Sequence, residues 1–476
     1  MRGALYPMVS TPVGLPVTTG VYMKRHSLAC LLAAGAVLLL HSCKAPPLDE
    51  LERSALDEIR QRTVGGEAPR SGDSPLPPTA STEDGLTEDE AAAIALWRNS
   101  DFAATLTELG LARADLVQAG LLTNPVFSFL FPLGPKEYEF ALTLPLEVIW
   151  LRPGRVALAG KQLERAGKLL VQRGLDLVRD ARVAHSELLL AAEKLRLARE
   201  AADLADRVAR VAEDRVRAGD AGEIEASTAR MDALLLREEA HRLEGELELA
   251  RERLRATLAL PVDLDFAAVE SAPPPAVPAE DLLVVDALLS RPDLRAARLA
   301  VEGAEERVRL AKLEILQVAG VLDANENRGG DLQLGPGVDI ELPIFDQNQG
   351  VIARAEAELA RSALEERALS ERVLSEVREA RIRWQTASEE EARWTDRILP
   401  QLEDLVRRAE IAYAAGDASI LLVLESTSSL VRVRARGVEA AARLRRARAD
   451  LERNVGRRVG IESAPSGTTA LAGSGM

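Results

Sequence analysis

Hydrophobic and polar residues alternate along residues 331–350, which have the sequence DLQLGPGVDIELPIFDQNQG. From Leu332 to Ile344 every even position is apolar or proline, and every odd position is polar, glycine or proline. A period of two is typical of a β-strand that has one apolar and one polar face. The pattern therefore predicts a long, two-faced strand. We expect a bulge or kink at its Gly-Pro-Gly interruption, 335–337.

A second pair of alternating stretches lies at 124–146, where three phenylalanines share one face of the first stretch. In the second stretch, Tyr138–Leu146, apolar residues again take one face and mostly polar or small residues the other. A membrane β-strand needs about 9–11 residues, with apolar side chains toward lipid and polar ones toward a lumen. This second stretch and 332–344 meet that requirement. The stretch 126–132 is short, and 318–325 has the weakest strand pattern.

Most of the remaining chain has helical periodicity, and the same plan occurs twice. The first copy is expected to contain a helix at 87–121, strands within 124–146, a long helix at 154–217 and a return helix at 224–258. The second copy is expected to contain a helix at 284–316, strands within 318–344, a long helix at 350–414 and a return helix at 421–455. The triplet 144–146 recurs 198 residues later, and Ala-Gly-Asp at 218–220 recurs 197 residues later. A period this long indicates a duplicated domain.

The two long helices would each have about 64 residues and a length of roughly 95 Å. Apolar residues in the first recur at heptad spacing, as in a coiled coil: Val183, Leu190, Leu197, Leu204 and Val211. Charged residues occur throughout both helices, so neither is apolar enough to cross a membrane. Long helices alone fit a coiled-coil scaffold equally well.

The N-terminal region has the features of a secretory leader. A basic start at Met23 is followed by a short apolar run and a small residue before Cys43. Residues 40–43 resemble a bacterial lipobox, which implies lipidation at Cys43. Plain cleavage near Ser42 is the alternative. Segment boundaries are expected at 1–43 (upstream extension and signal peptide), 44–85 (linker, with one short helix at 48–62), 86–270 (first repeat), 271–281 (Pro-rich joint), 282–457 (second repeat) and 458–476 (tail).

Composition limits the possible chemistry. Net charge is −15, which argues against a nucleic-acid partner, and aromatic residues make up only 3%, which favours Ala/Leu helix packing. The Lys and Arg residues alternate with Glu, as on solvated helix faces. Both cysteines lie in the leader, and beyond it only His185 and His241 remain, each expected on an ordinary helix face. We therefore expect no metal site, no cofactor and no enzymatic activity.

Four strands cannot close a barrel, and open sheet edges are not tolerated in lipid. The simplest solution is a cyclic oligomer in which each chain donates four strands, so that three chains give twelve.

Several stretches resemble the TolC-type outer-membrane efflux proteins across about 86–457. They are LTEDEAAAIALWRNSDF at 86–102, RPDLRAARLAVEGAEERVRLAK at 291–312, LPIFDQNQG at 342–350 and AYAAGDASILLVLE at 412–425. The resemblance implies a mainly α fold with a small β part. In it, duplicated long-helix hairpins form a trimeric α-barrel, and four strands per chain contribute to a twelve-stranded transmembrane β-barrel. It also implies a homotrimer in the outer membrane, with its helices in the periplasm, docked on a periplasmic adaptor and an inner-membrane pump.

The same resemblance assigns site residues. It places a periplasmic gate near the helix tips, where the family has two acidic residues around a Val-Leu pair. Glu425 matches the later acid, Leu422 replaces the earlier one, and Tyr413 matches a tip tyrosine. The adaptor-docking tips would be Gly219, Asp220, Gly416 and Asp417.

The parity of the strand residues supplies candidates for the barrel lumen. They are Glu139, Thr143, Asp331, Gln333, Asp339 and Glu341. An acidic lumen would favour cations.

Two other functions are compatible with parts of the sequence. One is an exported, lipid-anchored coiled-coil scaffold without a pore, and the other is a soluble, adaptor-like periplasmic protein. The membrane-length strands favour the function that the resemblance implies, an outer-membrane channel of a tripartite efflux or type I secretion system that exports substrate across the outer membrane. The sequence predicts no particular cargo among metal ions, drugs and polypeptides.

Overall fold

The computed structural model describes residues 45–63, 76–77, 80, 84–131, 136–219, 222–270, 277–327, 332–415, 417–418 and 420–459. All of them belong to one of the two contact units of the chain, Ala45–Met476. The expected signal peptide, Cys43, Asp220, Asp331, Gly416 and the tail beyond 459 lie outside the described residues.

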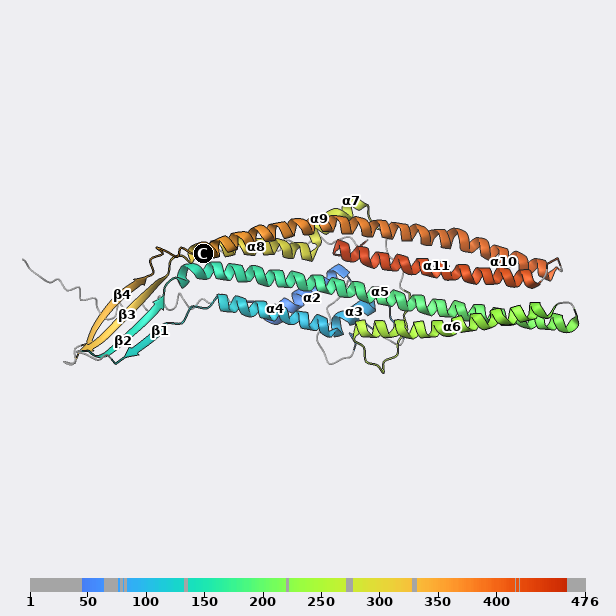
Figure 1. Ribbon diagram of the computed structural model, residues 1–476, viewed down its shortest axis with the longest axis horizontal. Coiled ribbons are helices and arrows are strands. Elements are labelled where there is room, and N and C mark those ends of the chain that lie inside the picture. The colour runs from blue at the N-terminus through green and yellow to red at the C-terminus, as the bar shows by residue number, and fades with distance from the viewer. Residues whose placement is uncertain are drawn as a thin grey trace, which may run out of the picture. The chain divides into compact units, whose positions relative to one another are not determined.

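Four antiparallel strands form one sheet in the order β1-β2-β3-β4 (Figure 1). They are β1 (Val126–Leu130), β2 (Lys136–Pro145), β3 (Val318–Asn327) and β4 (Leu332–Ile340). The pairing of β2 with β3 joins the two repeats, and the weakly patterned stretch at 318–325 is a full strand.

The bulge expected at 335–337 is absent, because β4 pairs with β3 without a register shift through this stretch. The Glu341 N–H donates to Gln317 O (3.2 Å), so Gln317 and Glu341 form a hydrogen-bonded cross-strand pair. Alternation along the ladder then places Pro336 in a non-hydrogen-bonded pair with Leu322, its nitrogen toward the open edge. A proline there removes no ladder hydrogen bond, so the strand stays regular. The register shift in this sheet lies instead in β2, between Lys136 and Tyr138.

The first repeat contains α3 (Glu88–Arg98), α4 (Ser100–Ala119), α5 (Val148–Ala218) and α6 (Glu223–Leu258). The single helix expected at 87–121 is broken at Asn99, which has an extended ψ of 118° and caps α4 by accepting the Phe102 N–H at 3.0 Å. Helix α5 is longer than expected, with 71 residues and a length of about 107 Å.

The second repeat contains α7 (Glu280–Ser290), α8 (Pro292–Leu313), α9 (Gln349–Arg393), α10 (Leu399–Ala414) and α11 (Ile420–Val455). The helix expected at 284–316 is broken at Arg291, because the following Pro292 disfavours helical geometry there and ψ is 123°. A π-helical turn, η1 (Trp394–Ile398), joins α9 to α10 within the long helix expected at 350–414.

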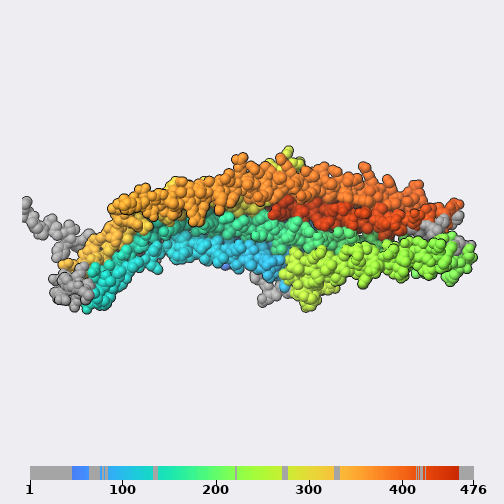
Figure 2. Space-filling view, in the orientation of Figure 1, coloured from blue at the N-terminus to red at the C-terminus, as the bar shows by residue number. Residues whose placement is uncertain are grey.

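Helix α5 is central to the packing, with contacts to α2 (Leu48–Thr63), α3, α4, α6, α8 and α11 (Figures 1 and 2). Buried alanines recur every seven residues on the face of α6 that packs against α5: Ala226, Ala233 and Ala240. This confirms close packing of helices through small residues. Helix α2, expected at 48–62, packs its fully buried Ile59 against Gly174 of α5.

Candidate channel lining and gate

One face of the sheet carries mainly apolar residues and glycine. The cross-strand register places Phe129 opposite Phe140, Phe140 opposite Ala324, and Ala324 opposite Leu334. The same face carries Phe127, Leu142, Leu144, Gly320, Leu322, Pro336, Val338 and Ile340. The even positions of β4 and the phenylalanines of β1 therefore share a face, although the two segments lie some two hundred residues apart.

This apolar face is exposed in the single chain. Phe127, on the edge strand β1, is 64% exposed, and Leu334, on the other edge strand β4, is 65% exposed. Stacked and edge-on aromatic contacts, such as Phe129 on Phe140 with ring centroids 4.8 Å apart, order the β1–β2 side. An apolar surface of this extent normally contacts a partner or a membrane.

The opposite face carries the polar residues. Glu139, Asn325 and Gln333 form one cross-strand row, and Thr143 and Asp339 lie in neighbouring rows on the same face. Glu341 follows the end of β4 and is exposed.

The alternation of the sequence did not indicate two polar residues of β3 that lie on this face. They are Asp323 and Asn325, whose side chains are linked by a hydrogen bond from Asn325 Nδ2 to Asp323 Oδ2 (2.7 Å). Their odd-numbered positions in the weakest strand pattern were the available signal. The charged side chains described on this face are all acidic: Glu139, Asp323 and Asp339.

The two helical tips differ in their local contacts. In the first, Gly219 adopts a left-handed conformation (φ 82°) that ends α5, and Arg215 pairs with Glu225 across the turn at 2.7 Å. In the second, the Asp417 N–H donates to Ala412 O (2.8 Å).

The candidate gate residues are all exposed at the second tip. Tyr413 lies near the end of α10, and Leu422 and Glu425 lie three residues apart on α11, so they share a helix face. Ser426 donates to Leu422 O (2.7 Å), which fixes the first turns of α11.

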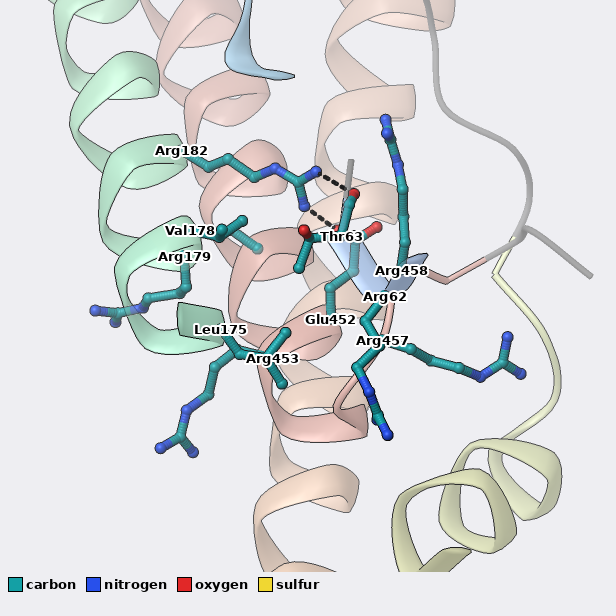
Figure 3. A pocket seen from close by; sticks show the side chains of 11 residues that line it. Arg62, Thr63, Leu175, Val178, Arg179, Arg182, Glu452, Arg453, Arg457 and Arg458 are labelled. Carbon is teal, nitrogen blue, oxygen red and sulfur yellow. Dashed lines mark hydrogen bonds and ion pairs between the residues drawn. The ribbon is translucent and has the colours of Figure 1, made fainter. Parts of the chain in front are cut away.

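A buried arginine cluster joins four helices, and Figure 3 shows several of its side chains. Arg182 of α5 has a side chain only 5% exposed; it pairs with Glu452 of α11 at 2.5 Å and Asp89 of α3 at 2.9 Å, and it donates to Thr63 O of α2 at 3.0 Å. Arg62 of α2 donates to Ser290 O and Gly456 O, at the C-terminal ends of α7 and α11.

This cluster corrects the view that the arginines lie only on solvated faces. Arginines suit these positions because helix C-termini present unpaired carbonyls and a partial negative charge. The cavity at the cluster is about 10 Å³, room for a single water molecule at most, so the arrangement is a structural junction between the repeats.

His185 of α5 lies in the core at 2% exposure, and its Nε2 is 2.7 Å from Leu86 O. Burial lowers the pKa of His185, so the neutral imidazole donates to that carbonyl. Within the described ranges, no helix has the length and hydropathy needed to cross a membrane, and no cluster of His, Cys, Asp and Glu has the geometry of a metal site.

Residues 283–457 match the family model of the outer membrane efflux proteins. No curated protein matches the sequence.

Three solved structures illustrate the similarity in fold. VceC of Vibrio cholerae, an outer membrane protein, is 17% identical with a TM-score of 0.63, over 78% of this chain and 96% of VceC. The CmeC outer membrane channel of Campylobacter jejuni is 15% identical with a TM-score of 0.61, over 84% and 95%. CusC, whose structures concern folding and transmembrane channel formation, is 17% identical with a TM-score of 0.62, over 82% and 99%.

Proposed function

We infer that this chain, a member of the outer membrane efflux protein family, is the outer-membrane channel of a tripartite efflux system. It is a TolC-type channel protein rather than an enzyme, and its helical part lies in the periplasm. The two-faced sheet carries this inference, because one chain presents an apolar surface to lipid and a polar surface to water.

The open edges of the sheet support assembly into a trimer. Strands β1 and β4 are at the two ends of the sheet order, so each has one side without a neighbouring strand among the described residues. Pairing β4 of one chain with β1 of the next would remove these edges, and three chains would close a twelve-stranded barrel.

The helices also expose apolar residues suited to contacts between chains. Near the tip of α6, Ile224 (84% exposed), Met231 and Leu235 form an exposed stripe at helical spacing. Helix α10 exposes Leu405 and Ile411 (63%) at a similar distance from its tip. We propose that these exposed apolar residues of α6 and α10 pack against each other between neighbouring chains, which would cover both sets.

The barrel lumen would be lined by Glu139, Thr143, Asp323, Asp339 and Glu341. Around a threefold axis each acid becomes a ring of three, which attracts cations and repels anions. We therefore propose a preference for cationic over anionic solutes in this part of the channel.

The gate is proposed at Tyr413, Leu422 and Glu425, which would narrow the periplasmic end. A ring of Leu422 side chains would repel water, and the Glu425 ring would bind cations. The tips at Gly219, Asp220, Gly416 and Asp417 would bind a periplasmic adaptor that connects the channel to an inner-membrane pump.

Cys43 is proposed as a lipid anchor, preceded by the signal peptide in 1–43. The repeats would then span 86–270 and 282–457, after the linker at 44–85, with the joint at 271–281 between them and the tail at 458–476. Mass spectrometry of the mature N-terminus tests this, since a Cys43→Ala variant would lose the acyl mass.

Spin labels placed on consecutive residues of β2 test the orientation of the sheet. Cysteines would be introduced singly at Phe140, Ala141, Leu142 and Thr143 in protein reconstituted into liposomes. We expect the labels at 140 and 142 to collide with oxygen in the lipid and those at 141 and 143 with a water-soluble nickel complex. A label at Arg383, on the exposed face of α9, serves as a water-accessible control. Equal nickel access at all four strand positions would refute the channel and favour the scaffold.

A further inference from the structure

The second helical hairpin contains a discontinuity that the first lacks. At η1 the Leu399 N–H donates to Trp394 O, five residues back, and Pro400 follows directly. A proline inside an α-helix collides with the carbonyl four residues earlier and removes one hydrogen bond. The wider π turn accommodates the ring, and such turns mark points where a helix bends.

The facing helix also has a weak point at the same level. Gly437 of α11 packs against this turn, and a Cβ at Gly437 would lie 3.4 Å from Leu399 Cδ1 and 4.0 Å from Trp394 Cβ. Glycine inside a helix lowers its resistance to bending and fraying. The matching positions of the first repeat lie 197 residues earlier in the chain. They are Ala240, which corresponds to Gly437, and Asp203, which corresponds to Pro400. Helix α5 accordingly continues without interruption to Ala218.

Ion pairs hold the two hairpins together at the level of this discontinuity. Lys194 of α5 pairs with Glu439 of α11 at 2.7 Å, and Glu200 of α5 pairs with Arg434 of α11 at 3.6 Å. Closer to the tips, Arg237 pairs with Asp206 inside the first hairpin, and Arg408 pairs with Asp404 inside the second.

We propose that η1, Pro400 and Gly437 form a hinge about which the tip half of the α10–α11 hairpin bends, while the α5–α6 hairpin stays straight. Bending there displaces Tyr413, Leu422 and Glu425 together, since all three lie on the tip side of the hinge, and so changes the width of the periplasmic end. This step rests on the proposed channel function.

Hydrogen exchange of the full-length protein in detergent tests the hinge directly. In the wild type, amides of 394–404 and 434–440 exchange faster than those of the matched segments 197–207 and 237–243. Gly437→Ala slows exchange across the hinge by about 2–5-fold, the factor expected from the helix preference of alanine over glycine. Pro400→Ala restores a backbone N–H donor at position 400 and also slows hydrogen exchange across the hinge.

Gly245→Ala is the matched control, since Gly245 lies within α6 and no heavy atom lies within 4 Å of the position that its new methyl group would take. It slows exchange at its own site and leaves the hinge segments unchanged. Equal exchange in the two hairpins, or no effect of Gly437→Ala, overturns the hinge even if the protein conducts.

Single-channel recording of the same variants tests the link to opening. Gly437→Ala is expected to lower the open fraction by a similar factor, and Gly245→Ala to leave it unchanged. Slowed exchange with an unaltered open fraction overturns the role in opening. A protein that never conducts refutes the channel function, whatever its hydrogen exchange.

Discussion

Replacing two glycines of α5 by alanine is expected to change stability in opposite directions. At Gly174 a Cβ would lie 2.4 Å from Ile59 Cδ1, 2.9 Å from Cγ1 and 3.2 Å from Cγ2, and Ile59 is fully buried. At Gly160 no heavy atom lies within 4 Å of the Cβ position. The two substitutions therefore differ only in whether α2 is packed against the new methyl group.

The magnitudes follow from two effects. Alanine is favoured over glycine within a helix by about 0.5–1 kcal/mol, so Gly160→Ala should raise the free energy of unfolding by that amount. Overpacking a filled core costs about 1–3 kcal/mol, and three Ile59 carbons are too close at Gly174. We expect Gly174→Ala to lower the free energy of unfolding by about 1–2 kcal/mol after the helix gain is subtracted.

Urea unfolding followed by circular dichroism, in one detergent and at one protein concentration, measures both effects. The Ile59→Ala substitution should cost about 2–5 kcal/mol in the wild type and clearly less beside Gly174→Ala, because the new methyl group fills part of the cavity. If Gly174→Ala stabilised the protein as much as Gly160→Ala, α2 would not be packed on α5 as described.

Three further predictions concern the buried junction, the core histidine and the gate. Arg182→Met should lower the free energy of unfolding by about 3 kcal/mol, because it removes one of the two arginines, Arg182 and Arg448, that pair with the buried Glu452. Adding Glu452→Gln to this variant should recover part of the loss, as measured by urea unfolding. Burial lowers the pKa of His185, so the folded state binds fewer protons at this side chain than the unfolded state does. The free energy of unfolding should therefore fall as the pH drops below about 6.5, and it should fall more steeply in the wild type than in His185→Gln. Glu425→Gln and Leu422→Ala should each raise the closed-state conductance, and unchanged currents in both would remove these residues from the gate.

The strands and their faces could be predicted from the sequence because alternation is a local signal. The pattern from Leu332 to Ile344 identified β4 and its apolar face, although the strand itself ends at Ile340. What alternation could not show was which strands are neighbours. The pairing of β2 with β3 depends on contacts between repeats, and it places Asp323 and Asn325 beside Glu139 and Gln333.

The helix interruptions were only partly visible in the sequence. Pro292 and Pro400 were available signals for the break at Arg291 and for the π turn, whereas the break at Asn99 depends on a capping side chain that also donates to Thr257 O in α6. The buried pairing of Arg182 had no local signal, because its partners come from three other helices.

Single-channel conductance in planar lipid bilayers tests the central claim most directly. The purified full-length protein is expected to form detergent-extracted trimers that insert and give discrete, cation-selective current steps, with cation selectivity reduced by the triple substitution Glu139→Gln, Asp323→Asn and Asp339→Asn. A monomer that needs no detergent and gives no current steps would contradict the account.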